Sequence, residues 1–314
     1  MTSPGEPPGS GRVAVVTGAT SGIGRYVAHG LAAQGFTTVV VGRGEARASG
    51  AAAEIARSTG NPRVESLAVP DLAVRVQAKQ LASDLLARYP AIHLLVNNAG
   101  GYFDRRELTS EGLERTFALN VLAPFTLTVL LADRLRVSAP ARVVQVASTA
   151  HRRNIVDLSN LQGESEYEGF TMYGRSKLEL ILLTREFARR LAGTGVVVNA
   201  VHPGFIRSGF GDNNPGGAGF GVRIAKFLFA RSLTYGMKNV LYVATDPAAG
   251  AVSGEYFSRH RVARASTASY DMRTARALYE ACRQLAGTPD LPEPPPPAPT
   301  EAPPAAPAPA GISS

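Results

Sequence analysis

Short apolar runs alternate with longer amphipathic stretches along most of the 314-residue chain. The short runs are β-branched and almost continuously hydrophobic, as is typical of parallel strands buried on both faces. They predict six strands, at Val13–Thr17, Thr37–Val41, Val64–Val69, His93–Asn97, Arg142–Ala147 and Val196–Val201, with a final edge strand at Val252–Phe257. The intervening stretches predict helices that include Gly24–Gln34, Ala46–Ser58, Val74–Tyr89, Leu113–Arg136 and Tyr173–Leu191. Such alternation implies right-handed crossovers, and therefore an α/β fold with a single Rossmann-type, doubly wound parallel sheet and helices on both faces.

The two ends of the chain differ from this core in composition. Residues 1–11 are rich in glycine, proline and serine, and we expect them to be disordered. Residues 288–314 consist mostly of proline and alanine, which predicts an extended, polyproline-like tail. Such a tail is either simply solvated or a docking segment for a protein that binds proline-rich motifs. The predicted domain spans residues 12–287.

Composition narrows the possible environment and partners. Cys282 is the only cysteine, so no intrachain disulfide is possible, metal sites built on cysteine pairs are excluded and no metal is expected. The start of the chain does not resemble a secretory signal, and no apolar run reaches the roughly 18 residues of a membrane-spanning helix. We therefore expect a cytoplasmic protein without a transmembrane segment. The net charge of +8 does not predict nucleic-acid binding, because 29 of the 33 basic residues are scattered arginines.

A glycine-rich loop follows the first predicted strand and opens the first helix. Its spacing is Gly-x-x-x-Gly-x-Gly, from Gly18 through Gly22 to Gly24, with Ser21 and Ile23 between. Glycines at this place permit a tight turn and a close backbone approach to a pyrophosphate at the helix N-terminus. The position of the loop between strand and helix favours a dinucleotide site.

The residues after the next strands suggest which dinucleotide is bound. The second strand ends at Arg43 without the acid that usually binds the ribose of NAD, and an arginine pairs well with a 2′-phosphate. We therefore favour NADP(H) over NAD(H), with Arg25 as a second candidate for the phosphate, although either side chain could be an ordinary surface arginine. Asp71, followed by Leu72, could bind the adenine amine or cap the next helix.

Tyr173 and Lys177 are four residues apart at the start of a strongly helical stretch, so they share one helix face. A neighbouring ammonium stabilises a phenolate, and we expect Lys177 to lower the pKa of Tyr173. That arrangement suits proton transfer to or from a substrate oxygen. The same spacing also arises by chance on solvated helix faces.

Together these motifs resemble the short-chain dehydrogenase/reductase family. The glycine loop, Asn97-Asn98-Ala99-Gly100, Ser148, the Tyr173–Lys177 pair and Pro203-Gly204 follow in the order of that family over about residues 11–287. The closest resemblance is to its retinol dehydrogenase and WW-domain oxidoreductase branch. The stretches that carry it are residues 160–164, 184–191, 202–204 and 252–257 and the long step from Ser148 to Tyr173.

The resemblance implies a catalytic tetrad of Asn120, Ser148, Tyr173 and Lys177. In carbonyl reduction Tyr173 would donate a proton to the substrate oxygen and Ser148 would hydrogen-bond that oxygen. Lys177 would bind the nicotinamide ribose, and Asn120 would hold a water molecule that links Lys177 to solvent. Without the resemblance, Ser148 could merely cap a turn and Asn120 could be a buried asparagine bonded to backbone.

The resemblance also implies further cofactor contacts. Asn98, Ala99 and Gly100 would line the adenosine side, Pro203 and Gly204 would flank the nicotinamide, and Ser208 would replace a threonine that bonds the carboxamide.

Residues 209–230 join a glycine-rich run to a predicted apolar helix, which suits a lid over a lipophilic substrate. The alternatives are a helix packed on the domain and a helix that contacts a membrane surface. The family also implies a possible homodimer through the helices Leu113–Arg136 and Tyr173–Leu191. The expected activity is hydride transfer between NADP(H) and a lipophilic alcohol or carbonyl. The alternatives are a steroid- or polyketide-type ketoreductase and a catalytically idle NADP(H)-binding protein.

Overall fold

The structure is a computed structural model that describes residue 7, residues 9–204 and residues 233–293. The predicted cofactor residue Ser208, the predicted lid and the chain beyond residue 293 lie outside the described residues. Among the helices of the described ranges, none combines the length and the apolar content that crossing a membrane requires.

A single eight-stranded sheet forms the centre of the protein, with strand order β3-β2-β1-β4-β5-β6-β7-β8. All neighbours are parallel except the last pair, β7 and β8. The strands are β1 Val13–Thr17, β2 Thr37–Gly42, β3 Val64–Ala68, β4 Leu94–Asn97, β5 Ala141–Val146, β6 Val196–His202, β7 Tyr256–Ser258 and β8 Arg261–Val262. This order confirms the doubly wound Rossmann-type sheet that the sequence predicts.

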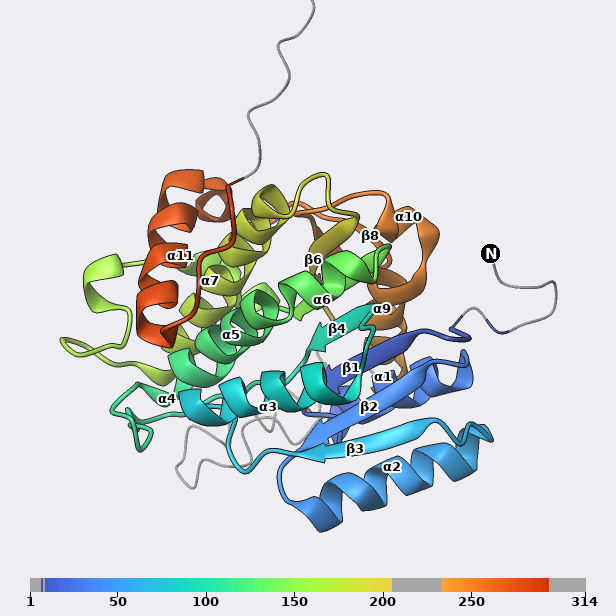
Figure 1. Cartoon of the computed structure of the whole chain (residues 1–314). Coiled ribbons are helices and arrows are strands. Elements are labelled where there is room, and N and C mark those ends of the chain that lie inside the picture. The colour runs from blue at the N-terminus through green and yellow to red at the C-terminus, as the bar shows by residue number, and fades with distance from the viewer. Residues whose placement is uncertain (1–6, 8, 205–232, 294–314) are drawn as a thin grey trace, which may run out of the picture.

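Helices cover both faces of the sheet (Figure 1). They are α1 Gly22–Ala33, α2 Glu45–Thr59, α3 Arg75–Arg88, α4 Arg115–Phe117, α5 Ala123–Leu130, α6 Ala132–Val137, α7 Gly169–Arg190, α9 Leu233–Thr245, α10 Pro247–Gly250 and α11 Met272–Ala286. Successive strand residues point to opposite faces, and so Val15 and Val39 join the core under α3, α5, α7 and α11. Val16 and Val40 join the second core, under α1, α2 and α9.

Three elements differ from the sequence prediction, and the first is α7, which begins at Gly169, four residues before the predicted start at Tyr173. The strand predicted to form the edge begins later, at Tyr256, and it is not the edge, because the chain turns at Arg259 and His260 and adds the short antiparallel β8. The single helix predicted over 113–136 is divided into α4, a π-helical turn at Ala118–Leu122, α5 and α6. Residues 116–129 are all buried except Leu119, so this segment has no one-sided apolar pattern that the extra residue of a π turn would shift, and the sequence does not reveal the turn.

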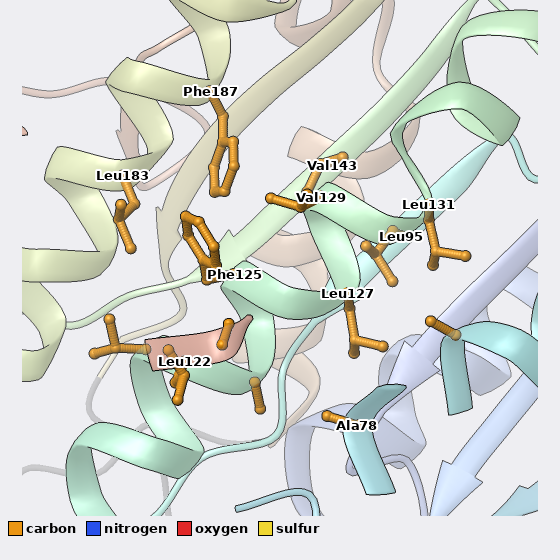
Figure 2. Close-up of a cluster of buried hydrophobic side chains, with 14 of the residues drawn as sticks. Ala78, Leu95, Leu122, Phe125, Leu127, Val129, Leu131, Val143, Leu183 and Phe187 are labelled. Atoms are coloured by element: carbon orange, nitrogen blue, oxygen red, sulfur yellow. The ribbon is translucent and has the colours of Figure 1, made fainter. Parts of the chain in front are cut away.

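Aromatic rings join three of the helices on the α7 side of the sheet. Phe125 of α5 lies 5.5 Å from Phe187 of α7, and Tyr279 of α11 lies 5.2 Å from Phe125 and 5.9 Å from Phe187, centroid to centroid. Figure 2 shows the first two rings facing each other among Leu183, Val129 and Val143. Each such pair contributes about 0.5–1.5 kcal/mol beyond the burial of its area. Helix α11 is therefore part of the core rather than an appendage.

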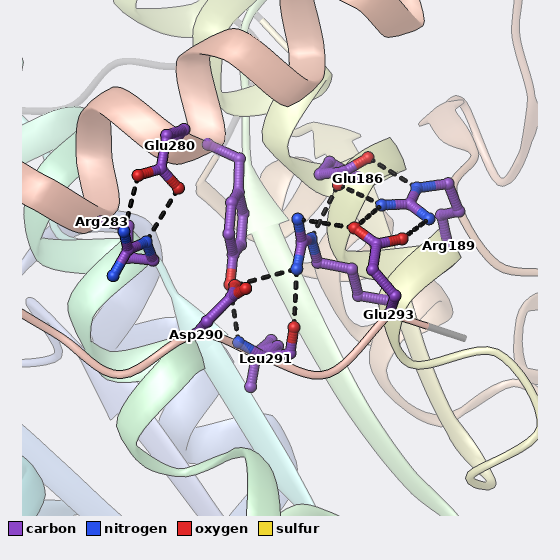
Figure 3. Close-up of polar contacts among 9 residues, drawn as sticks. Glu186, Arg189, Glu280, Arg283, Asp290, Leu291 and Glu293 are labelled. Carbon is purple, nitrogen blue, oxygen red and sulfur yellow. Dashed lines mark hydrogen bonds and ion pairs between the residues drawn. The ribbon is translucent and has the colours of Figure 1, made fainter. Parts of the chain in front are cut away.

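Ion pairs fasten the chain after α11 to the end of α7 (Figure 3). Buried Glu186 accepts hydrogen bonds from both Arg189 and Arg190, and Arg190 Nη1 also reaches Asp290 at 2.9 Å. Glu293 pairs with the same two arginines. Residues 288–293 are thus packed against the domain, whereas the sequence predicts that the disordered tail starts at 288.

At the other end of the domain, Gly9 N donates to Gln34 O at 2.8 Å, so Gly9 contacts the end of α1, whereas Gly11 is exposed.

Candidate functional site

The predicted site residues converge at the carboxyl ends of the central strands, where the strand order reverses between β1 and β4. Thr17, at the end of β1, ties these two strands together, because its Oγ1 accepts hydrogen bonds from Asn98 N and Ala99 N, both at 3.0 Å. Asn98 returns a bond from its side-chain nitrogen to Thr17 O at 2.8 Å. Ligands of doubly wound folds bind in the crevice at such a reversal.

The glycine loop next to this crevice requires glycine at several positions. Gly18 and Gly22 have φ values of +65° and +53°, in the left-handed region that other residues rarely adopt. A side chain on Gly24 would collide with the Asn98 amide and the Gly18 carbonyl. Ser21, at the start of α1, makes no side-chain cap to the helix, and the first turn carries no acid. The loop and helix N-terminus therefore fit a bound pyrophosphate, which needs close backbone approach and N–H donors.

The polar residues around the loop are partly committed to other partners. Arg43 is exposed at the end of β2. Arg25, by contrast, forms an ion pair with Glu54 of α2, which occupies the second candidate for a 2′-phosphate. Asp71 binds Arg115 through Oδ2 at 2.8 Å and accepts from Ala73 N through Oδ1 at 3.0 Å, so it closes the turn before α3 rather than capping the helix itself.

Three of the four predicted catalytic side chains lie together at the end of β5. Tyr173 and Lys177 occupy one face of α7, with Lys177 Nζ 5.6 Å from the centroid of the Tyr173 ring. Lys177 Nζ donates to Val146 O at 3.0 Å, and the hydroxyl of Ser148, two residues further, is hydrogen-bonded to Tyr173. The same hydroxyl accepts from Ala150 N at 3.2 Å, and so it holds the turn that follows β5.

Burial dominates the protonation of this pair. It raises the pKa of Tyr173 to about 12, against the lowering effect of the Ser148 hydrogen bond. It lowers the pKa of Lys177 to about 8. The net shift of the Tyr173 pKa is therefore upward, whereas the spacing alone predicts a lower value, because the cost of burying a phenolate is the largest cause. At pH 7 the phenol is protonated and most of the lysine is charged.

Asn120, the fourth residue, is held by backbone and lies in the π-helical turn. Its Oδ1 accepts from Gly101 N at 2.8 Å, and its Nδ2 donates to Gly101 O at 2.9 Å and Ser176 Oγ at 3.0 Å. A Cβ atom on Gly100 would lie 3.1 Å from Asn120 Oδ1 and 3.3 Å from Lys177 Nζ. The amide thus fixes the loop after β4 against the lysine, and both of its donor hydrogens are already used.

Pro203 and Gly204 follow β6 at the same edge of the sheet. Asn239 of α9 donates to Pro203 O at 3.1 Å, and Gly204 has a φ of +109°. The bond from Asn239 fixes the backbone at Pro203, near the end of this described range.

Sequence reasoning missed two groups at the site. The first group is a pair of aromatic residues beside Tyr173. The Tyr102 ring lies 6.3 Å and the Phe170 ring, which is 56% exposed, lies 6.5 Å from the Tyr173 ring, centroid to centroid. The second group is His151, which is buried and bonded to the carbonyl oxygen of Ser148. The position of His151 three residues after Ser148 is the only signal in the sequence that could have indicated it.

Comparisons with known proteins agree with this geometry. The family model described as short chain dehydrogenase matches residues 12–218. The chain is 35% identical over 280 residues to retinol dehydrogenase 12 of Mus musculus, covering 88% of this chain and 87% of the relative.

Solved structures are similar as well. An uncharacterized protein from Mycobacterium Paratuberculosis superposes with a TM-score of 0.73 at 27% identity, over 93% of this chain and 99% of the other. A short chain dehydrogenase from Burkholderia cenocepacia J2315 in complex with NADP superposes with a TM-score of 0.62 at 26% identity, over 80% and 96%. Sheet order, site geometry and these similarities agree, and the chain belongs to the short-chain dehydrogenase family.

Proposed function

We propose that this oxidoreductase interconverts lipophilic carbonyl compounds and alcohols with NADP(H). The observation that carries the proposal is the contact between Ser148 and Tyr173 above the end of β5, with Lys177 on the same helix face. A protonated phenol and a hydroxyl that share a hydrogen bond suit a single substrate oxygen.

In this proposal each side chain has one task. The dinucleotide, held by Gly18, Gly22, Gly24 and the loop Asn98–Gly100, supplies the hydride chemistry when it is bound. In the reducing direction Ser148 donates a hydrogen bond to the substrate oxygen, and Tyr173 gives that oxygen its phenolic proton. Lys177, largely cationic at pH 7, offsets the negative charge that then develops on Tyr173. Alcohol oxidation uses the same groups in reverse.

The preference for NADP(H) rests on Arg43. Its side chain is exposed at the carboxyl end of β2, and the strand carries no acid there. We expect Arg43→Asp to lower kcat/KM for NADPH about 10- to 100-fold and to change it little for NADH. Arg47→Asp, an exposed arginine on α2, is the matched control and should leave the ratio unchanged. Equal losses with both cofactors would contradict the assignment.

The lipophilic substrate class rests on the aromatic side chains beside Tyr173. Phe170 remains more than half exposed next to the Tyr173 phenol, whereas Tyr102, edge-on to the Tyr173 ring, is itself buried. An apolar substrate would cover the exposed surface of Phe170 and stabilise the complex. Phe170→Ser should raise KM for long-chain and cyclic aldehydes several-fold while leaving acetaldehyde unaffected.

Tyr173→Phe tests the chemistry. Loss of the proton donor should lower kcat about 10²- to 10⁴-fold, with NADPH binding measured by fluorescence within about twofold of wild type. Unchanged turnover across a panel of aldehydes, ketones and steroids would refute the mechanism. Cofactor binding without turnover of any member by the wild type would instead support an idle binding protein.

A further inference from the structure

A buried histidine links the predicted catalytic serine to a distant loop. His151 has no exposed surface and lies in the 3₁₀ turn Thr149–Arg153, directly after Ser148. Its Nδ1 lies 2.6 Å from Ser148 O, and its Nε2 lies 3.1 Å from the backbone nitrogen of Ser266. One side chain therefore joins the end of β5 to the loop before α11.

The two partners fix the protonation of the ring. A carbonyl oxygen only accepts a hydrogen bond and a backbone N–H only donates one. Nδ1 must consequently carry the proton that is given to Ser148 O, while Nε2 is bare and accepts from Ser266 N. The imidazole is thus neutral and of one tautomer, and a second proton would put two donors face to face at Ser266.

The surroundings of the ring favour this neutral form. Burial is the main cause that lowers the pKa of His151, and the nearby Arg152 cation adds to it, although the Ser148 bond opposes both. From β6, His202 faces the same region, and burial lowers its pKa to about 4, with His151 and Arg152 contributing. From β7, Tyr256 packs edge-on against the imidazole at 5.0 Å, and burial raises its pKa to about 12.

We propose that His151 is a positioning residue that holds Ser148 in register with Tyr173, and that protonation of His151 at acid pH releases this hold. The proposal rests on the proposed function of Ser148. Loss of the Ser266 bond would let the imidazole turn, and the carbonyl of Ser148 would then lose its donor. A shift of the serine by a fraction of an ångström is sufficient to impair a hydrogen bond to the reacting oxygen.

Two substitutions separate the two bonds. In His151→Asn the amide NH₂ takes the place of Nδ1–H, so the bond to Ser148 is retained and no titratable ring remains. In His151→Gln the longer side chain places its oxygen near Nε2, which retains the bond to Ser266 and loses the one to Ser148. His260→Asn is the control, because His260 is exposed on the β7–β8 turn and asparagine tolerates its φ of +58°.

The readouts are kcat from pH 5 to pH 8, cofactor KM and the tautomer. We expect kcat of the wild type and of His260→Asn to fall at pH values below the ordinary histidine pKa of 6.5. His151→Asn should keep kcat within about threefold of wild type and lose this acid limb, and His151→Gln should lose about 10- to 100-fold in kcat with an unchanged cofactor KM. Nitrogen-15 NMR of the full chain at pH 7 should show a protonated Nδ1 and a bare Nε2 for His151.

Several outcomes would overturn the inference. They are an acid limb that persists in His151→Asn, equal kcat in the two His151 variants, or a protonated Nε2 at pH 7. Ser148→Ala distinguishes the two levels of the argument. If that variant retained full turnover, the proposed function would fail, whereas the NMR result would still report on the bonds of His151.

Discussion

Glu179 is a buried acid that should make the stability of the protein fall with rising pH. It lies on α7, is 1% exposed, and its Oε1 has no hydrogen-bond partner within the described part of the chain. Burial is the largest cause that raises its pKa, from 4.5 to about 8; Arg175 lowers that pKa and Glu114 raises it. Its charge also acts on the thiol of Cys282 in α11, so the carboxyl lies where α7 and α11 pack together.

The sign follows from proton linkage. Because the pKa is higher in the folded state, the contribution of Glu179 is fully present below pH 4.5 and is lost as the pH rises toward about 8. At about 1.4 kcal/mol for each pH unit, the loss is about 3 kcal/mol between pH 5 and pH 7.5. Glu179→Gln cannot ionise, so relative to wild type it should gain about 3 kcal/mol over this interval.

Urea unfolding at pH 5 and pH 7.5, extrapolated to water, measures this difference. Glu164→Gln is the matched control, since Glu164 is exposed on the loop before α7 and its replacement should change little at either pH. A difference between Glu179→Gln and wild type that is equal at both pH values would refute the reasoning. It would show that Glu179 is ionised in the folded protein throughout this range.

Three further predictions concern the cofactor loop, the α7 ion pairs and assembly. Gly24→Ala should weaken NADPH binding at least about tenfold in a fluorescence titration, because its Cβ would collide with Asn98 and Gly18. In the control Gly50→Ala the added Cβ meets nothing within 4 Å, so binding should be unchanged. Glu186→Gln should lower the free energy of unfolding in urea by about 2–4 kcal/mol, because it leaves two arginines of α7 without their buried partner. In the control Asp133→Asn the original side chain is 92% exposed, and the loss should be less than about 0.5 kcal/mol. Light scattering should show no dimer that forms through α5 and α7, because α11 packs on both helices and residues 123–129 of α5 are all buried. A dimer that charged substitutions on these two helices abolish would contradict this prediction.

The sequence predicts those parts of the fold that depend on local pattern. Continuous β-branched runs identify the parallel strands of the sheet, and the spacing of Gly18, Gly22 and Gly24 identifies the turn that only glycine permits. The register of Tyr173 and Lys177 is equally local, since a helix fixes it. Each of these signals resides within a few neighbouring residues, so no knowledge of distant contacts is needed.

The features that escape prediction depend on contacts between distant segments. His151 meets Ser266, 115 residues away, and Glu293 meets Arg189 across 104 residues. The short strand β8 carries exposed residues and therefore lacks the apolar signal of the buried strands. Asn120 lies in a π-helical turn within a segment that is buried almost all round, so its bonds to Gly101 are visible only once the loop after β4 is folded against it.

The protonation of Tyr173 and Lys177 shows most directly what spacing omits. Spacing brings a cation near a phenol, and from that alone a lower phenol pKa follows. Folding buries both groups, and burial disfavours each charged form, so the pKa of the tyrosine rises to about 12 while that of the lysine falls to about 8. The buried pair therefore holds a proton on the phenol at neutral pH, which is the state that a donor to a carbonyl oxygen requires. Ser148 is the group whose hydrogen bond opposes this rise, and its position consequently affects how readily the phenol releases its proton.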